Sequence, residues 1–321
     1  MKMSIGFDVS KQTIDAAFID GENTEHVRVE NNQIGYNRVL EKIRRYKAEE
    51  IILTMEATGV YHCRCASFFE SLGFLVSVVN PLIIKRFADM KMSRAKTDKA
   101  DAKLIAQYGL NQKTYEYKTP SKNRLKIQVF LKTIESLKQE KTQHRNRLEA
   151  LAHCTFDMQE AATIHRDMIE QIDLYIKQLE KKIAAIVDEE YSEAYAHLLS
   201  IPGIGKRVAA AVLGNFGDME NFTTAKQLVG YIGLNSSPRE SGTSIRGKGS
   251  ISRKGNSYLR KLFFLASLSA CKYNKSCRDL YERLIAKGKA KKVALIAVAN
   301  KLVRQSFAIV KFNRAYNASF C

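Results

Sequence analysis

The sequence predicts two structural classes within one chain: a mixed α/β region at the N-terminus and a long, mostly helical region after it. Short apolar runs separated by turn residues occupy the first 80 positions, whereas apolar residues at helical spacing dominate beyond about position 122. The chain of 321 residues holds 17 glycines and 4 prolines, about half the usual share. This composition argues against an all-β or low-complexity chain and favours helices.

The N-terminal elements alternate in a recognisable order. Residues 3–9, 14–19 and 25–30 predict a meander of three strands, which a helix containing Val39, Leu40 and Ile43 follows. A strand at 51–55, a helix at 60–72 and a strand at 74–79 come next. The order βββαβαβ predicts a mixed sheet whose central strands are parallel and covered by helices. Ribonuclease-H-like folds have this order.

The remaining chain is expected to form two further parts. Residues 1–120 are the predicted α/β domain, and residues 121–192 carry apolar residues at helical spacing, which favours a helical or coiled-coil connector. Residues 193–321 form a mostly α C-terminal domain, in which Ile201-Pro202-Gly203-Ile204-Gly205-Lys206 lies between two apolar helices and resembles a helix-hairpin-helix. Three domains are therefore expected.

The charge of the chain predicts a polyanionic partner. There are 52 Lys and Arg against 33 Asp and Glu, which gives a net charge of +19. Residues 239–321 alone hold 19 cationic and three acidic side chains, and residues 118–147 hold nine and two. The basic stretch at 118–147 fits either a nucleic-acid surface or a solvated helix face. A nucleic acid is the expected partner of the C-terminal third.

The location expected from the sequence is the cytoplasm, with association to the nucleoid when the protein acts on DNA. Asp8 interrupts the N-terminal apolar stretch before it reaches the length of a signal peptide. Six cysteines without a framework pattern fit a reducing compartment. No apolar run is expected to span a membrane, because the best candidate, Leu262 to Cys271, is short and broken by serines.

Four carboxylates are candidates for one site. Asp8 ends the first predicted strand and Glu56 follows the fourth, and these strands are neighbours in a ribonuclease-H-like sheet. Asp98 and Asp101 lie three residues apart at the start of a predicted helix, so they share a face. Four carboxylates in one place raise each other's pKa unless a divalent cation neutralises them. Mg²⁺ or Mn²⁺ suits such oxygen donors at a phosphodiester.

Each of these acids also has an ordinary structural explanation. Asp8 can begin a turn with Ser10, Glu56 can be an exposed loop acid, and the Asp98–Asp101 pair can complement a helix N-terminus. The coincidence of all four with the βββαβαβ order favours the cluster over these separate explanations.

A Gly/Ser-rich basic segment is the second candidate site. It runs from Gly233 to Asn256, and its backbone amides and cationic side chains suit phosphate binding. A serine in such a loop can attack phosphorus when a base or metal activates it, although composition alone does not single out Ser241 among its neighbours. The residues expected to bind nucleic acid are Gly203, Gly205, Lys206, Arg239, Arg246, Lys248, Arg253 and Lys254.

These motifs together resemble the DEDD transposases of the insertion sequence 110/1111 group. The resemblance rests on Gly233-Leu234 with Ser241-Gly242, on Arg253-Lys254-Gly255-Asn256, on the Pro202–Gly205 turn and on the four acids, and it covers nearly the whole chain. One departure is that Ser236 stands where many members have proline, with Pro238 two residues later. Carried over by position, the resemblance implies that Asp8, Glu56, Asp98 and Asp101 bind metal and that Ser241 is the nucleophile.

The resemblance also implies an activity and partners. It implies a RuvC-like catalytic domain joined to a transposase domain, a phosphoserine intermediate with Mg²⁺ or Mn²⁺, and strand exchange between element ends and target duplex DNA. A bridge RNA as guide, a homodimer or homotetramer and active sites shared between subunits are further implications. Two alternatives stay open: a metal-dependent junction-resolving endonuclease, in which Ser241 only binds phosphate, and a non-catalytic nucleic-acid-binding protein.

Overall fold

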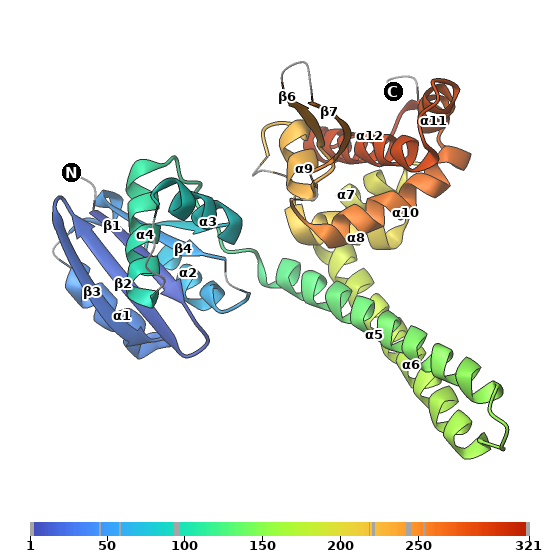
Figure 1. The fold of residues 1–321 in the computed structure, drawn as a ribbon, viewed down its shortest axis with the longest axis horizontal. Coiled ribbons are helices and arrows are strands. Elements are labelled where there is room, and N and C mark those ends of the chain that lie inside the picture. The colour runs from blue at the N-terminus through green and yellow to red at the C-terminus, as the bar shows by residue number, and fades with distance from the viewer. Residues whose placement is uncertain are drawn as a thin grey trace. The chain divides into compact units, whose positions relative to one another are not determined.

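The structure of the chain is a computed structural model (Figure 1). It describes residues 3–44, 46–57, 59–92, 97–217, 219, 222–241, 245–252 and 254–318, without the side chains of residues 237–249. The chain forms two compact units, Met1–Pro120 and Ser121–Cys321. The first is mixed α/β with a five-stranded sheet, and the second is mostly helical.

The sheet of the first unit has the strand order β3-β2-β1-β4-β5. Its strands are β1 (Met3–Val9), β2 (Thr13–Asp20), β3 (Asn23–Glu30), β4 (Ile51–Glu56) and β5 (Leu75–Val79). β1, β2 and β3 pair antiparallel, whereas β4 runs parallel to both β1 and β5. The predicted meander and the predicted central parallel strands are therefore both present.

Helices cover both faces of this sheet. The helical elements are α1 (Gln33–Ile43), the short 3₁₀ helix η1 (Ala48–Glu50), α2 (His62–Ser71), α3 (Pro81–Met90) and α4 (Asp98–Asn111). Phe7 of β1 stacks on Phe69 of α2 in the larger core, which also takes in Val39 of α1. Ala102 and Ala106 of α4 pack against β2 on the opposite face. Successive residues of β1 thus point alternately to α1 and α2 or to α4.

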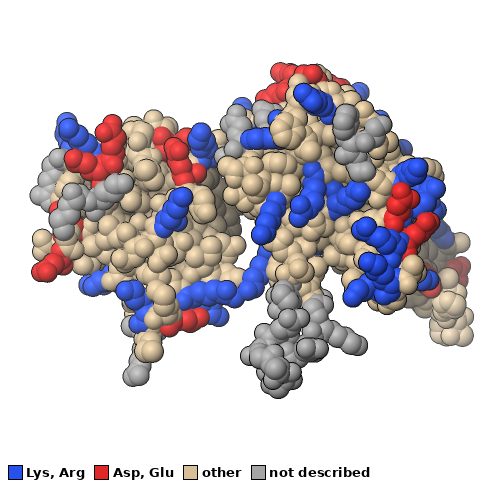
Figure 2. Space-filling model, turned by 90° about the horizontal axis from the view of Figure 1, so that it is seen from above, with Lys and Arg blue, Asp and Glu red and all other residues tan. Residues whose placement is uncertain are grey.

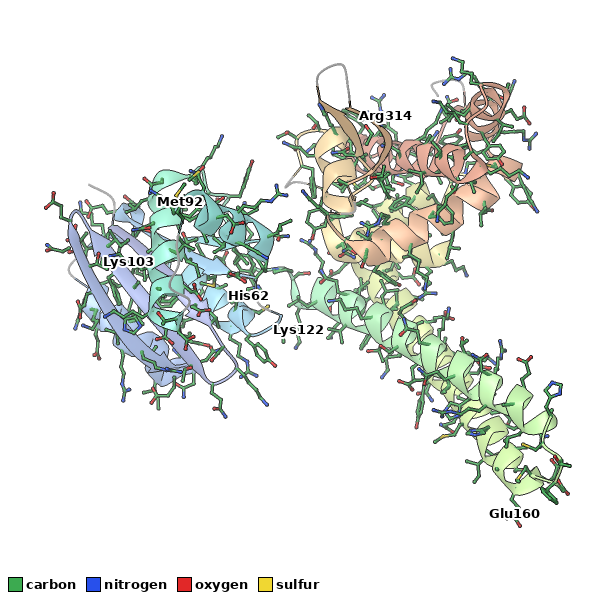
Figure 3. The ribbon with its side chains drawn as sticks, in the orientation of Figure 1. His62, Met92, Lys103, Lys122, Glu160 and Arg314 are labelled. Atoms are coloured by element: carbon green, nitrogen blue, oxygen red, sulfur yellow. The ribbon has the colours of Figure 1, made fainter. Side chains whose placement is uncertain are left out.

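The second unit begins with two long helices, α5 (Lys122–Ala152) and α6 (Gln159–Glu190). They run antiparallel, so that Lys122 and Glu160 lie at opposite ends of the pair (Figure 3). The helices that follow are α7 (Ser192–Leu199), α8 (Lys206–Phe216), α9 (Ala225–Ile232), α10 (Ser257–Tyr273), α11 (Lys275–Ala286) and α12 (Lys291–Phe312). One apolar core joins them to the near parts of α5 and α6.

The expectation of a loop between Gly233 and Asn256 was wrong for its centre. Strands β6 (Ser236–Ser241) and β7 (Ile245–Ile251) pair antiparallel as a hairpin. Backbone hydrogen bonds define such a pair, and polar and glycine-rich strands without apolar alternation give little indication of it in the sequence. The C-terminal unit is therefore mostly, but not entirely, helical.

The expectation that no apolar run reaches membrane length was also wrong. α12 has 22 residues, and a window within it has a mean hydropathy of 1.5, which is long and apolar enough for a span. Of that window, 56% is buried inside the second unit, where α12 packs against α9, α10 and α11. This burial is the arrangement of a core helix of a globular protein.

Candidate active site

Two glycines bring α4 directly onto the sheet. A Cβ atom added to Gly6 of β1 would lie 2.2 Å from the carbonyl oxygen of Ala102, and one added to Gly109 would lie 2.3 Å from Thr54 Oγ1. No larger residue fits either position without moving the helix. Close contact at these two glycines fixes the distance of α4 from β1 and β4.

The direction of α4 follows from the same contacts. Gly109, near the end of the helix, lies over Thr54 and Ser4, and the Ser4 hydroxyl donates a hydrogen bond of 2.8 Å to the Ala106 carbonyl. Ala102, about two turns before Gly109, lies over Gly6. The helix thus runs opposite to β1 and β4, and its first turn reaches the carboxyl ends of both strands.

The four predicted acids are brought together by this arrangement. Asp8 lies two residues beyond Gly6 on the α4 face of β1, and Glu56 lies two residues beyond Thr54 on the same face of β4. Asp98 and Asp101 belong to the first turn of α4, where the Thr97 side chain caps the helix by accepting from the Ala100 amide at 3.2 Å. Negative charge is favourable at this end of a helix.

The carboxylates also influence each other's ionisation. Burial, and then the charges of Asp101, Asp98 and Glu56 and of Asp15, raise the pKa of Asp8 from 3.8 to about 6. Burial and the charge of Asp101 likewise raise the pKa of Glu56. The neighbouring carboxylate charges thus oppose the ionisation of Asp8 and Glu56.

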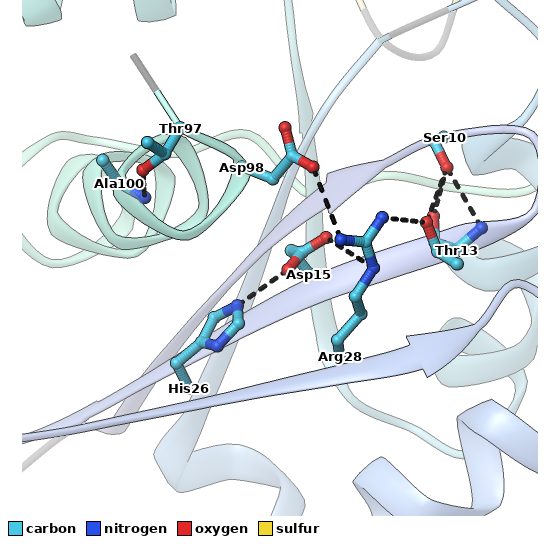
Figure 4. A network of polar contacts seen from close by, with 8 residues as sticks. All are labelled: Ser10, Thr13, Asp15, His26, Arg28, Thr97, Asp98 and Ala100. Carbon is cyan, nitrogen blue, oxygen red and sulfur yellow. Dashed lines mark hydrogen bonds and ion pairs between the residues drawn. The ribbon is translucent and has the colours of Figure 1, made fainter. Parts of the chain in front are cut away.

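An arginine that the sequence analysis did not single out spans this site. Arg28 of β3 lies 3.8 Å from Asp98 (Nη1 to Oδ2) and 3.7 Å from Asp15 (Nε to Oδ2), and Figure 4 shows dashed lines from its guanidinium group to both acids. It also donates to Thr13 Oγ1 at 3.2 Å, while His26 Nε2 lies 2.8 Å from Asp15 Oδ1. Asp15 is only 4% exposed. Arg28 therefore links a buried acid of the sheet to the first residue of α4.

A sequence signal for Arg28 existed. Asp15 interrupts the apolar strand Ile14–Ile19, pairs with Asp8 in the β1–β2 register and with Arg28 in the β2–β3 register. A polar residue at a covered position of a strand needs a partner, and the cross-strand neighbour is the first place to look.

The donor set suits a divalent cation in its chemistry but not yet in its geometry. The four acids offer carboxylate oxygens, which hard cations prefer, and their mutual repulsion is what a cation would relieve. Within the residues that the structure describes, no three His, Cys, Asp or Glu side chains are already arranged for coordination. Side-chain rotation would have to complete the ligand sphere.

The two glycines in the turn between α7 and α8 have different surroundings. Gly203 has φ +105°, and a Cβ there would lie 2.6 Å from the Ala270 Cβ of α10. Gly203 therefore allows the turn to pack closely on α10, and its contact with a phosphate stays a prediction. Nothing lies within 4 Å of a Cβ on Gly205, which precedes α8, and Lys206 is exposed in its first turn. Gly205 and Lys206 remain accessible to a ligand.

The second candidate site lies on the β6–β7 hairpin. Ser241 is the last residue of β6 and pairs with Ile245 of β7. Lys254 is exposed, and Asn256 caps α10 by accepting from the Leu259 amide at 3.0 Å. The side chains of four expected site residues, Arg239, Ser241, Arg246 and Lys248, and the whole of Arg253 lie outside the described residues.

Comparison with known proteins defines the class of the chain. Residues 5–156 match a family described as "Transposase", and residues 195–282 match one described as "Transposase IS116/IS110/IS902 family". With the full-length relatives below, these matches show that the chain belongs to the IS110/IS116 group of transposases and recombinases. It is an enzyme that acts on DNA.

Two relatives match along nearly their whole length. The chain is 33% identical to the pilin gene-inverting protein of Moraxella bovis and 34% identical to that of Moraxella lacunata, in each case over 98% of both chains. It is also 35% identical over 121 residues to the insertion element IS110 uncharacterized 43.6 kDa protein of Streptomyces coelicolor, a match that covers 38% of this chain and 30% of that protein.

Proposed function

We propose that the protein cuts and rejoins DNA strands at specific sites through a phosphoserine intermediate formed by Ser241. The observation that carries this proposal is the convergence of Asp8, Glu56, Asp98 and Asp101, which α4 produces by lying directly on β1 and β4. The strand order β3-β2-β1-β4-β5, with β1 parallel to β4, supports a ribonuclease-H-like, RuvC-like first domain. Carboxylates at this edge suit phosphodiester chemistry.

In this mechanism the Ser241 oxygen forms a bond to phosphorus while the bond from phosphorus to the bridging oxygen of the DNA strand breaks, and a general acid gives that leaving oxygen its proton. The hydroxyl proton of Ser241 passes to a general base, and the free strand hydroxyl later reverses the step on the same phosphorus. Energy of the broken bond is kept in the serine ester, so that rejoining needs no nucleotide cofactor. The four acids would hold Mg²⁺ or Mn²⁺, which supplies charge neutralisation at the phosphate oxygens.

The partners proposed are duplex DNA at the recombining sites and, from the family resemblance, a guide RNA. The names of the two Moraxella relatives, pilin gene-inverting proteins, favour inversion of a DNA segment as one outcome. Joining two duplexes needs more than one subunit, so we propose a homodimer or homotetramer that shares acids and serine between subunits. The α7–α8 turn, as a helix-hairpin-helix, binds DNA backbone through Gly205 and Lys206.

The test compares wild-type protein with Ser241→Ala, Glu56→Gln and the control Ser237→Ala, a serine on the same strand. Each is incubated with junction DNA, the adjacent transcript and Mg²⁺, and denaturing gels measure covalent protein–DNA adduct and cut DNA. We expect adduct with wild type and Ser237→Ala and none with Ser241→Ala. Cut DNA without adduct, unchanged in Ser241→Ala and lost in Glu56→Gln, would instead establish a metal-dependent nuclease.

A further inference from the structure

An extended groove lies along α12 in the second unit. It has a volume of about 890 Å³ and is bounded by α11, α12 and the base of the β6–β7 hairpin. Its apolar part includes Leu280, Val293 and Ile296, and its polar part includes Lys292, Lys301 and Arg304. We call this the α12 groove. A basic border with an apolar floor is unusual for an ordinary solvated surface.

The α12 groove continues along the helix into a second hollow. This hollow, of about 460 Å³, shares Lys301 and Arg304 with the groove and extends to Phe312 and Arg314. Arg314 lies just beyond α12 (Figure 3). The Arg304 Nε donates to Asn300 Oδ1 at 2.8 Å, which holds the guanidinium group at the junction of the two hollows. The two hollows form one track along α12.

The charge of the α12 groove indicates which kind of molecule it binds. Residues 283–321 contain nine Lys and Arg and no Asp or Glu. Among the described side chains, no carboxylate pairs with Lys292, Lys301 or Arg304. Lys and Arg also outnumber Asp and Glu on the face of the second unit seen in Figure 2. A polyanion is the ligand that this track complements.

The apolar floor of the α12 groove favours an unpaired nucleic-acid strand over a duplex as the ligand. In a duplex the faces of the bases are stacked inside and cannot contact a protein floor, whereas an unpaired strand presents both phosphates and base faces. The groove begins beside Ser236 and Ser250, at the base of the hairpin whose first strand ends at Ser241. Five residues of strand separate Ser236 from Ser241, about 17 Å at about 3.4 Å per residue.

From these observations we infer that the α12 groove holds the unpaired DNA strand released next to the cleavage point, with phosphates on Lys301 and Arg304 and bases on the floor at Val293 and Ile296. This inference rests on the proposed function of Ser241, because it takes the hairpin as the place of cleavage. Holding the strand keeps its end near the protein until it is rejoined, without contacting any base edge.

The experiment measures binding of a fluorescent 12-nucleotide DNA strand, its duplex and the RNA strand of the same sequence by anisotropy, across a salt series. The variants are Lys301→Gln/Arg304→Gln for the border and Val293→Ser for the floor, since Val293 is 53% exposed and tolerates a polar residue. The control is Lys181→Gln/Lys182→Gln, which removes the same charge from exposed positions of α6. Circular dichroism checks that each variant is folded.

We expect the border variant to weaken DNA-strand binding and to flatten the slope of log affinity against log salt by about 1.4, since each lost phosphate contact contributes about 0.7. Val293→Ser should weaken strand binding without changing the slope and leave duplex binding unchanged. The control Lys181→Gln/Lys182→Gln should lose less affinity for the DNA strand than the border variant loses. Equal losses in the border variant and the control would overturn the inference, as would a border variant weakened only for RNA or only for duplex.

The two proposals fail in distinguishable ways. An adduct that depends on Ser241, in a protein whose strand binding ignores Lys301 and Arg304, would overturn the groove and leave the proposed function standing. Strand binding that depends on Lys301 and Arg304, in a protein that forms no adduct, would retain a strand-binding groove and refute its link to Ser241. Displacement of the bound strand by an acidic peptide with higher affinity would assign the groove to a protein partner and overturn the inference.

Discussion

Asp8→Asn should stabilise the metal-free protein at neutral pH while it abolishes strand cleavage. The pKa of Asp8 is raised from 3.8 to about 6, so the folded state binds a proton more tightly than the unfolded state does. Stability from this group is therefore fully present below about pH 4 and is lost as the pH rises through about 6. Above pH 6 the charged side chain opposes folding.

The expected change in the free energy of unfolding follows from the pKa shift of Asp8. A shift of this size corresponds to about 3 kcal/mol at about 1.36 kcal/mol per unit, and partial exposure to solvent reduces it to about 1–2 kcal/mol. Asparagine keeps the shape and removes the charge, so Asp8→Asn should raise the free energy of unfolding by about 1–2 kcal/mol at pH 7.5 in EDTA. At pH 4 the two proteins should be nearly equal.

The assay is urea unfolding of the full chain at both pH values, with the matched control Asp20→Asn on the same sheet, since Asp20 is not among the charges that raise the pKa of Asp8. Added Mg²⁺ should stabilise wild type more than Asp8→Asn if the four acids bind it. An Asp8→Asn protein that is less stable than wild type at pH 7.5 would refute the electrostatic reasoning about this cluster.

The other predictions concern the parts that assemble the cluster. Arg28→Met should lower the free energy of unfolding by about 1–3 kcal/mol, because it removes a partner of the buried Asp15, and Arg28→Lys should recover part of that loss in urea unfolding. Gly6→Ala should lower it by about 1–3 kcal/mol and reduce DNA cleavage, because the new methyl group overlaps the Ala102 carbonyl. Gly205→Ala, with open space around it, serves as the stability control for Gly6→Ala, and equal melting temperatures of these two variants would contradict the close approach of α4.

The sheet and its acids could be predicted because local patterns determine them. The sequences of β1 and β4 are short and apolar, and each has an acid near its end. Asp8 is the second-last residue of β1, and Glu56 is the last residue of β4. Asp98 and Asp101 follow Thr97, an ordinary helix cap. Strand order then brings Asp8 and Glu56 to neighbouring strand ends. The position of Asp98 and Asp101 beside them depends in addition on how α4 lies on the sheet.

Long-range features escaped prediction. The close approach of α4 depends on Gly6 and Gly109, which are 103 positions apart and indistinguishable in sequence from turn glycines. The β6–β7 hairpin has no apolar alternation, because its strands pair chiefly through the backbone. The length and apolar composition of α12 also escaped the sequence analysis. A helix of this composition suits both a membrane span and the core of a globular protein, because both environments favour apolar side chains.

The most direct test of the account is to identify the residue that carries DNA. Adduct formed by the wild-type protein on junction DNA with Mg²⁺ is denatured, digested with nuclease and protease, and analysed by mass spectrometry. The account predicts a nucleotide on the hydroxyl oxygen of Ser241. A nucleotide on another residue, or DNA that is cut and rejoined with no adduct at any time point, would contradict it.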